Sequence, residues 1–355
     1  MNLHKILLFG AFCLSSVSLQ AIELADTDLK PNSKQHSKPD RAQSVDEVGS
    51  FGTLTLENDL FAGKDGGYTN GIGYSWGYGP YTDFSESNAP SWLVDMGEFL
   101  FIDASDDKEK AVSYSIFQGM QTPEDIESEE LIENDLPYAG LLGWRGTLYA
   151  WDNDVADQFS LIMGMVGPAS LAKDTQKAVH HITGSDKPRG WKNQLHNEFV
   201  FSVTGQRSWR FAVGNGDGMG MDFLTFASAS AGTYNSEVAT SAMFRYGSGL
   251  EQSFPAVSIL PGRDINPLAG AESEHFYMFF GAQARYAFND IFVDGNTFRD
   301  SHSVTLKHEG FILSTGAVWS WQQWGMIFSL AETSSTFEER PGKARFGSLS
   351  INYRF

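Results

Sequence analysis

The sequence predicts an all-β fold, a transmembrane antiparallel β-barrel of about twelve strands with a short helix in one extracellular loop. Three observations support this prediction: a signal-like N-terminus, apolar residues that alternate with small or polar ones from about residue 50 onward, and a last strand that ends on Phe355. Length alone, 355 residues, would also suit two or three soluble domains. Aromatic residues make up 14% of the chain and charged residues only 19%, which favours the barrel.

The N-terminal segment, residues 1–21, has the short basic start, apolar stretch and small cleavage-site residue of a signal peptide. We therefore expect export to the outer membrane of a Gram-negative bacterium. The only cysteine, Cys13, lies in this segment, so a disulfide scaffold and a cysteine nucleophile are excluded. Residues 22–47 are polar and aperiodic and predict a disordered lead-in. Residues 48–355 are expected to form a single barrel domain.

The alternation is clearest at the C-terminus, where one strand face carries apolar side chains and the other carries polar ones. The apolar face holds Leu349, Ile351, Tyr353 and Phe355. Such a face looks inward in a soluble sandwich and outward to lipid in an outer-membrane barrel, and alternation alone does not separate the two. The signal peptide, the absence of a mature thiol and the terminal Phe favour the membrane.

Twelve candidate strands follow from the pattern, and the one interrupted by "GNGDGMGMD" is the hardest to delimit. With both termini in the periplasm, connections after odd-numbered strands lie at the outer surface, whereas the long segments 80–110 and 249–274 would be periplasmic. The expected strands are 50–58, 68–79, 111–121, 138–151, 157–166, 195–206, 209–231, 235–248, 275–287, 308–320, 324–334 and 346–355.

The formal net charge of −19 repels polyanions and excludes nucleic acid as a general partner. Against that background, basic residues gather between positions 173 and 192. They are either a local anion site, facing phosphates of the outer leaflet, or the ordinary charges of a solvated loop. The cluster consists of Lys173, Lys177, Lys187, Arg189 and Lys192.

The same region, "PASLAKDTQKAVHHITG", predicts the one convincing helix, with Ser170 as N-cap and Gly184 as C-cap. Gln176 and His180 are four residues apart and project from the same face. His180 can exchange a proton near neutral pH. Alternatively, a histidine late in a helix simply stabilises the negative end of the helix dipole.

The first predicted hairpin, "ENDLFAGKDGGYTNG", places Asn58 and Asp59 at the end of one strand and Thr69 at the start of the next. Strand parity puts Thr69 opposite the lipid-facing aromatic residues. Amide and carboxylate oxygens suit Ca²⁺. The alternative is that these are turn-forming residues and nothing else.

Taken together, "ENDLF…YTNG", "DLPYAG" at residues 135–140, "TQKAVHHITGSDKPRGWKNQL" at 175–195 and "DGNTF" at 294–298 resemble the LpxR-type lipid A 3′-O-deacylase family over nearly the whole mature chain. The resemblance implies a twelve-stranded enzyme barrel that removes the 3′-linked acyloxyacyl chain of lipid A in a Ca²⁺-dependent hydrolysis. Two departures stand out: an acidic loop near Ser128, where a relative has a basic residue, and Leu136, where Arg is common.

Residue by residue, the resemblance implies Asn58 and Asp59 as metal ligands, and Thr69, Gln176, His180 and Asp186 as catalytic residues. Asp186 stands where a relative has Glu. We expect His180 to act as general base on a water, with Ca²⁺ stabilising the oxyanion and with Lys173, Lys177 and Lys187 binding substrate. Lipopolysaccharide is the expected substrate, and a monomer is expected. The alternatives are an outer-membrane phospholipase and a non-enzymatic small porin or adhesin.

Overall fold

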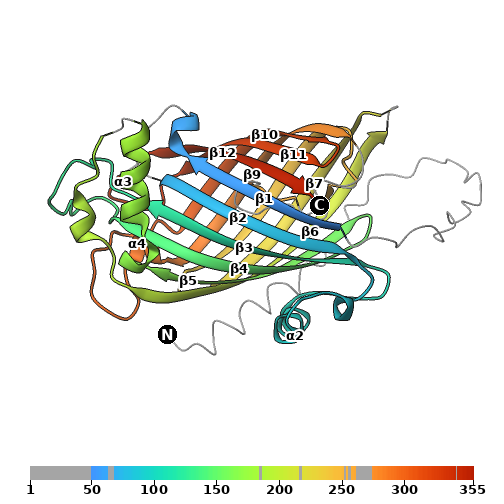
Figure 1. Ribbon diagram of the computed structural model, residues 1–355, viewed down its shortest axis with the longest axis horizontal. Helices are drawn as coiled ribbons and strands as arrows, with labels where there is room; N and C mark the ends of the chain where they lie inside the picture. Colours follow the sequence, from blue (N-terminus) through green and yellow to red (C-terminus); the bar gives the residue numbers. More distant parts are fainter. Residues whose placement is uncertain are drawn as a thin grey trace, which may run out of the picture. The chain divides into compact units, whose positions relative to one another are not determined.

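The chain folds into a closed barrel of twelve antiparallel strands in sequence order (Figure 1). The computed structural model describes residues 49–62, 68–183, 186–215, 218–251, 253–254, 257–260, 274–340 and 342–355. The predicted signal peptide and lead-in lie outside these residues. The strands are β1 (Gly49–Asn58), β2 (Tyr68–Tyr81), β3 (Glu109–Gln121), β4 (Ala139–Trp151), β5 (Val155–Val166), β6 (Glu198–Asn215), β7 (Gly220–Gly232), β8 (Asn235–Gly247), β9 (His275–Asp290), β10 (Glu309–Trp321), β11 (Trp324–Ser334) and β12 (Lys343–Arg354).

The barrel closes where β1 pairs with β12, from Phe51 opposite Arg354 to Asn58 opposite Gly347. Short polar side chains face inward along this seam. Thr55 Oγ1 lies 2.8 Å from Ser350 Oγ, and Asn352 donates an amide hydrogen bond of 2.8 Å to Thr53 Oγ1. The lumen is therefore polar at the closing seam.

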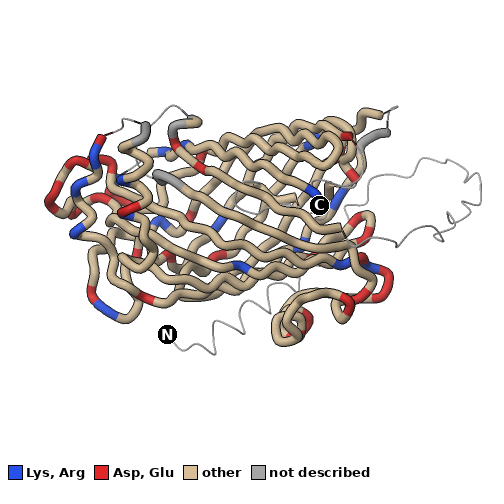
Figure 2. The backbone as a smooth tube through the Cα atoms, viewed as in Figure 1, with Lys and Arg blue, Asp and Glu red and all other residues tan. Residues whose placement is uncertain are grey.

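The outer surface of the wall is apolar, as the alternation predicts. In β1, Leu54 and Leu56 are exposed whereas Thr53 and Thr55 are buried, and in β2 Ile72 and Tyr74 are exposed. Acidic and basic residues gather in the loops at the two ends and leave the wall between them largely uncharged (Figure 2). An apolar exterior around a polar interior is the arrangement of an outer-membrane barrel, so the predicted fold class is confirmed.

No helix among the described residues is long and apolar enough to cross a bilayer.

The boundary between β6 and β7 differs from the prediction, which placed it near residue 208. β6 continues without a break to Asn215 and pairs with β7 through Gln206 opposite Ser228. The prediction treated the glycine-rich stretch "GNGDGMGMD" as an interruption within the seventh strand. In the structure this stretch instead connects the end of β6 to the start of β7. Glycines break regular strands because they lack a side chain to pack, and here they mark the connection.

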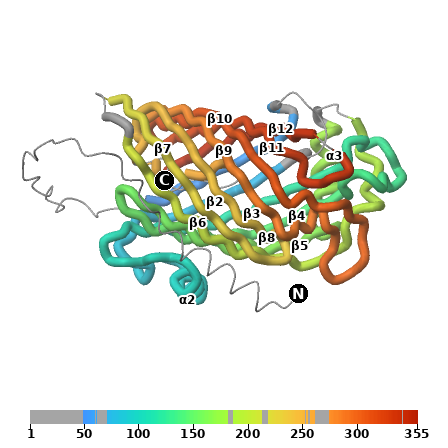
Figure 3. The backbone as a smooth tube through the Cα atoms, turned by 180° about the vertical axis from the view of Figure 1, so that it is seen from behind, coloured from blue at the N-terminus to red at the C-terminus, as the bar shows by residue number. Residues whose placement is uncertain are grey.

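The loops divide between two ends of the barrel. One end, which we call the α3 end, carries the 3-10 turn η1 (Asp59–Ala62), helix α3 (Ala172–Thr183) and the short helix α4 (Ile291–Asp294) (Figure 1). The C-terminus lies at the other end, which we call the C-terminal end (Figure 1). The back view shows α2 (Ser91–Leu100) at the end opposite α3 (Figure 3). This ten-residue helix, in the long β2–β3 connection, was not predicted.

The C-terminal end of the lumen is filled with apolar side chains. Leu250, Phe254, Val257 and Ile259, from the described part of the β8–β9 connection, form one buried cluster with inward-facing strand residues. The wall contributes Leu224, Phe226, Met243, Tyr277, Phe279, Val318 and Ile327 to this plug. Such packing does not suit the porin alternative, which needs an open aqueous channel.

A buried ion pair fastens this plug to the wall. The guanidinium of Arg245 donates to both carboxylate oxygens of Asp222, and both residues are fully buried. Arg245 also donates to Ser253 Oγ at 2.8 Å and to the carbonyl of Leu250 at 2.6 Å. One side chain thus joins β7, β8 and the plug.

Replacing Asp222 with Asn leaves the buried Arg245 charge without its carboxylate and should destabilise the barrel by about 3–5 kcal/mol. The measurement is the temperature at which the folded barrel converts to the slow-migrating form on gels. Arg245→Met is the matched variant, because Asp222 keeps its 2.9 Å pair with Arg210. An Asp222→Asn barrel as stable as the parent would contradict the anchoring role.

Candidate active site

Helix α3 sits on the outside of the wall at the α3 end because its start packs directly on β4. A Cβ on Gly140 would lie 2.3 Å from Ala172 Cβ and from Ser170 Oγ, so only glycine permits this contact. Gln118, on β3, donates its amide to the carbonyl of Ser170 at 2.5 Å. The helix is thereby held at a defined height on the barrel.

The predicted helix is confirmed, with small differences at its start. Its first residue is Ala172, preceded by Leu171 at φ +60° and by a 3-10 turn, η3 (Pro168–Ser170). The Ser170 hydroxyl accepts the Ala172 N–H at 3.4 Å. Ser170 therefore caps the helix, but it lies two residues before the first helical residue and not one as predicted. The predicted C-cap, Gly184, lies outside the described residues.

His180 is almost fully buried and makes one decisive hydrogen bond. Its Nδ1 lies 2.6 Å from the backbone carbonyl oxygen of Asp186. A carbonyl only accepts, so Nδ1 carries the proton and Nε2 of the neutral ring keeps its lone pair. The geometry therefore prepares Nε2 to accept a proton.

The side chain of Asp186 is exposed, and the described contact to His180 comes from the main chain. Sequence comparison assigned Asp186 by its carboxylate, and no pattern in side-chain identity could have indicated a carbonyl contact. Because the carbonyl belongs to the main chain, Asp186 can orient His180 although its side chain is shorter than the Glu of a relative.

Gln176 lies one turn before His180 and is buried. Its Oε1 accepts the indole N–H of Trp191 at 2.8 Å. An indole nitrogen only donates, so the amide oxygen must face Trp191 and the amide NH₂ must point away from it. That NH₂ is buried and has no acceptor among the described residues, which makes it a donor available to a ligand.

Trp191 and Tyr138 form the support behind Gln176. Their ring centroids are 4.9 Å apart, and both are buried with Met120 and Ala172. Burial raises the pKa of Tyr138 to about 12. The phenol therefore stays protonated and donates to the carbonyl of Ile126 at 2.9 Å. Sequence reasoning had not singled out Trp191, although it lies in the conspicuous "RGWKNQL" motif.

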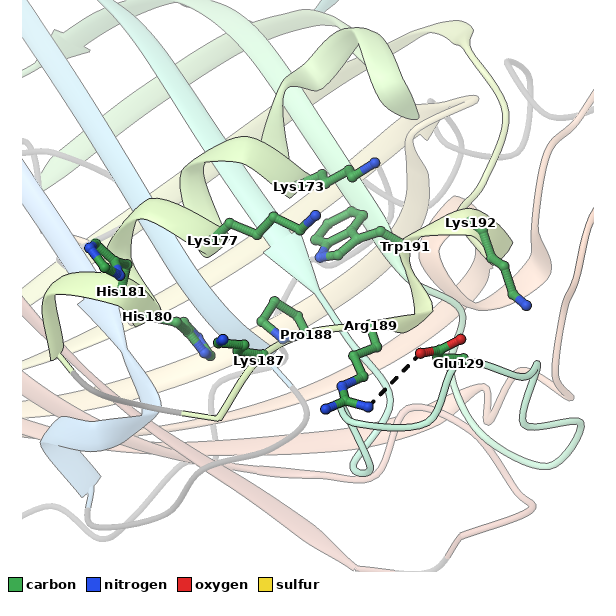
Figure 4. A pocket seen from close by; sticks show the side chains of 10 residues that line it. All are labelled: Glu129, Lys173, Lys177, His180, His181, Lys187, Pro188, Arg189, Trp191 and Lys192. Atoms are coloured by element: carbon green, nitrogen blue, oxygen red, sulfur yellow. Dashed lines mark ion pairs between the residues drawn. The ribbon is translucent and has the colours of Figure 1, made fainter.

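A hollow of about 800 Å³ opens between α3 and the segment that follows it (Figure 4). Five cationic side chains and two histidines line it, with Glu129 as its single acidic residue. Lys173, Lys177 and Lys187 make no ion pair with a described residue. The basic residues are those that the sequence had grouped: Lys173, Lys177, Lys187, Arg189 and Lys192.

The acidic loop between β3 and β4 packs against this basic segment. Arg189 donates its backbone N–H to the carbonyl of Ile126 at 2.8 Å and its side chain lies 3.9 Å from Glu129. Lys192 lies 3.1 Å from Glu130. These side chains are exposed, so the pairs contribute little stability. Arg189, from the segment after α3, therefore lies against the loop that contains Ser128.

Asn58 and Asp59 end β1 and begin η1 at the same end of the barrel as α3 (Figure 1). Asp59 is buried and Asn58 is partly exposed. Thr69 falls at an irregularity in the β2–β3 register, between Tyr68 and Asn70, and its side chain lies outside the described part of the structure. The described residues contain no group of three or more His, Cys, Asp or Glu that could hold a metal ion.

Trp191→Phe should loosen α3, because it keeps the ring packing but removes the donor to Gln176 Oε1. Leaving that buried oxygen unsatisfied costs about 1–3 kcal/mol, so amide hydrogen exchange in α3 should accelerate roughly 5- to 150-fold. Trp92→Phe, in the helix at the opposite end, is the matched control. Unchanged exchange in α3 would show that the indole hydrogen bond does not hold the helix.

The fold is that of an outer-membrane β-barrel, with a buried histidine and a basic hollow at one rim. The family model described as "Outer membrane protein LpxR" matches residues 9–355. The chain therefore belongs to the LpxR outer-membrane protein family. This membership makes it an ester hydrolase, a lipid A 3′-O-deacylase.

Among solved structures, LpxR from Salmonella typhimurium has a TM-score of 0.71 at 16% sequence identity and covers 85% of this chain and 99% of that one. At that identity the match supports the fold. The β domain of the Bordetella autotransporter BrkA has a TM-score of 0.44 at 9% identity, covering 87% of this chain and 99% of its own. No curated protein sequence matched the chain.

Proposed function

We propose that the α3 end is the catalytic site for hydrolysis of the 3′-linked acyloxyacyl ester of lipid A, with His180 as general base. The observation that carries the proposal is the hydrogen bond from His180 Nδ1 to the Asp186 carbonyl, because it leaves Nε2 as the basic nitrogen. Nε2 takes a proton from water while the water oxygen bonds to the ester carbonyl carbon. Collapse breaks the bond to the sugar 3′ oxygen, which receives the proton from Nε2.

Gln176 is suited to the charge that develops on the ester carbonyl oxygen. Its NH₂ is held by the Trp191 contact in an orientation that does not need to change during the reaction. A preorganised donor of this kind stabilises an oxyanion without reorganisation. We therefore assign Gln176 a catalytic role and the Asp186 carbonyl a positioning role.

The basic hollow suits the phosphate-bearing headgroup of lipid A. Lys173 and Lys177 follow one another on the same helical face, and Lys187 lies on the opposite side of the hollow (Figure 4). None of these three lysines forms an ion pair with a described carboxylate, and the one acidic residue of the hollow, Glu129, lies beside Arg189. We infer that they bind substrate phosphates and that Arg189 replaces the basic residue absent near Ser128.

Calcium fits the chemistry of Asn58 and Asp59, which offer hard oxygen donors and no nitrogen or sulfur ligand. Asn58 and Asp59 would hold the ion together with Thr69 and nearby carbonyls. When bound, Ca²⁺ would supply positive charge that stabilises the ester oxygen as it becomes negative. We expect a monomer to be sufficient, because all of the proposed residues come from one chain.

His180→Asn should lower the rate of lipid A deacylation by about 10²–10⁴-fold, because the amide cannot take up the proton. His196→Asn is the matched control: this histidine is exposed, does not line the hollow and should keep near-normal activity. Lipid A from cells that express each variant is analysed by mass spectrometry for loss of the acyloxyacyl unit. Full activity of His180→Asn would remove this residue from the mechanism. Lysophospholipid in place of shortened lipid A would identify a phospholipase.

A chelator should abolish deacylation by the purified barrel, and added Ca²⁺ should restore it. Asp59→Asn should raise the Ca²⁺ concentration needed for half-maximal activity by at least about tenfold, because removing a carboxylate weakens a hard-cation site. Glu129→Gln, which changes a carboxylate in the basic hollow, serves as the control and should leave the calcium requirement unchanged. Activity that survives chelation would exclude the metal from the reaction.

A further inference from the structure

Helix α2 covers the outside of the barrel wall near the C-terminal end (Figure 1). Beneath it, the outward-facing residues Val112, Leu148 and Phe159 are 0% exposed. On the same outward faces nearer the α3 end, Ile116 is 51% exposed and Leu142 38% exposed. The helix has therefore replaced part of the lipid-facing surface with protein.

Three stripes run along α2, each set by the 3.6-residue repeat. Leu93 and Gly97 face the wall, and a Cβ on Gly97 would lie 2.7 Å from Leu148 Cδ1. A second stripe, the apolar flank, is uncovered. It consists of Trp92 at 49%, Phe99 at 87% and Leu100 at 44% exposure, with Met96 between them.

The third stripe is the polar flank, Ser91, Asp95 and Glu98, and all three residues are exposed. The apolar and polar flanks lie on opposite sides of the line of contact with the wall. Figures 1 and 3 both show the helix nearly end-on, so its axis runs across the barrel axis. A helix in that orientation presents one flank towards the membrane and the other towards the aqueous rim.

An ion network holds the segment after α2 against the wall. Lys108, just after α2, lies 2.9 Å from Asp157 on β5, and Arg207 on β6 donates to the same carboxylate at 2.6 Å. Lys108 and Asp157 are both buried. The ring of Phe101 packs over Gly205, where a Cβ would lie 2.7 Å from it. The segment following the helix is thus clamped to the wall.

We propose that α2 is an interfacial membrane helix whose apolar flank inserts into the phospholipid leaflet at the C-terminal end of the barrel, opposite the leaflet that α3 faces. The helix packs on an outward strand face whose other residues, such as Ile116 and Leu142, stay exposed, and an apolar flank beside such a face identifies the occupant as lipid. Tryptophan and phenylalanine beside acidic residues suit the boundary between acyl chains and headgroups. Because the helix carries two carboxylates and no Lys or Arg, insertion depends on apolar contact and not on anionic headgroups.

The test places a single environment-sensitive label in the full chain. Cys13, the only cysteine, is changed to Ser, and one cysteine is introduced by Phe99→Cys, by Glu98→Cys on the polar flank, or by Ile116→Cys on the bare wall. Each bimane-labelled barrel is reconstituted in phosphatidylcholine vesicles with or without brominated acyl chains. All three sites are exposed, so the labels do not disturb the fold.

We expect the labels at positions 99 and 116 to be quenched by bromolipid at least threefold more than the label at 98. Adding 30% phosphatidylglycerol should leave this ratio unchanged. Equal quenching at 99 and 98 would overturn the proposal. So would quenching at 99 that falls when unlabelled barrel is added to the vesicles, because that result would assign the flank to a second copy of the chain.

Discussion

Closure of the sheet is the constraint on which the rest of the structure depends. In a bilayer, each backbone N–H and C=O must be paired within the protein, because hydrocarbon offers no partner. Pairing of β1 with β12 removes the two free edges. It also brings the end of β1, with Asn58 and Asp59, to the same rim as the loops that follow β3 and β5. Parts of the candidate site that are over a hundred residues apart in sequence therefore lie at the same end of the barrel (Figure 1).

The candidate site lies outside the lumen. Gly140 allows the start of α3 to rest on the outward face of β4, so the helix stands beside the region where lipid lies. His180 and Gln176 are then set by contacts behind them, a backbone carbonyl and an indole, and not by the lumen. This placement suits a substrate that remains embedded in the leaflet while one of its esters is cleaved. These contacts hold the proposed catalytic groups in place, and a preorganised donor or base of this kind needs little reorganisation during a reaction.

Much of this architecture could be predicted from sequence because side chains along each strand of a barrel alternate between the lipid-facing and the lumen-facing side. The strand count, the alternating faces of the last strand, helix α3 and the cluster of basic residues on and after it were all predicted. The β6–β7 boundary was wrong because glycines occur both in barrel strands and in turns. Helix α2 was missed because ten mostly apolar residues in a long connection have no distinctive pattern until the wall that they cover is known. The contact from Asp186 could not be predicted, since a main-chain carbonyl has no residue signature.

The plug at the C-terminal end has a consequence for the supply of reactants. Leu250, Phe254 and Ile259 pack tightly within the described interior and are tied to the wall through Arg245. The described interior at that end is therefore occupied by packed apolar side chains. The proposed site, on the outside of the wall at the α3 end, would therefore exchange its reactants with the membrane and the medium at that end and not through the lumen.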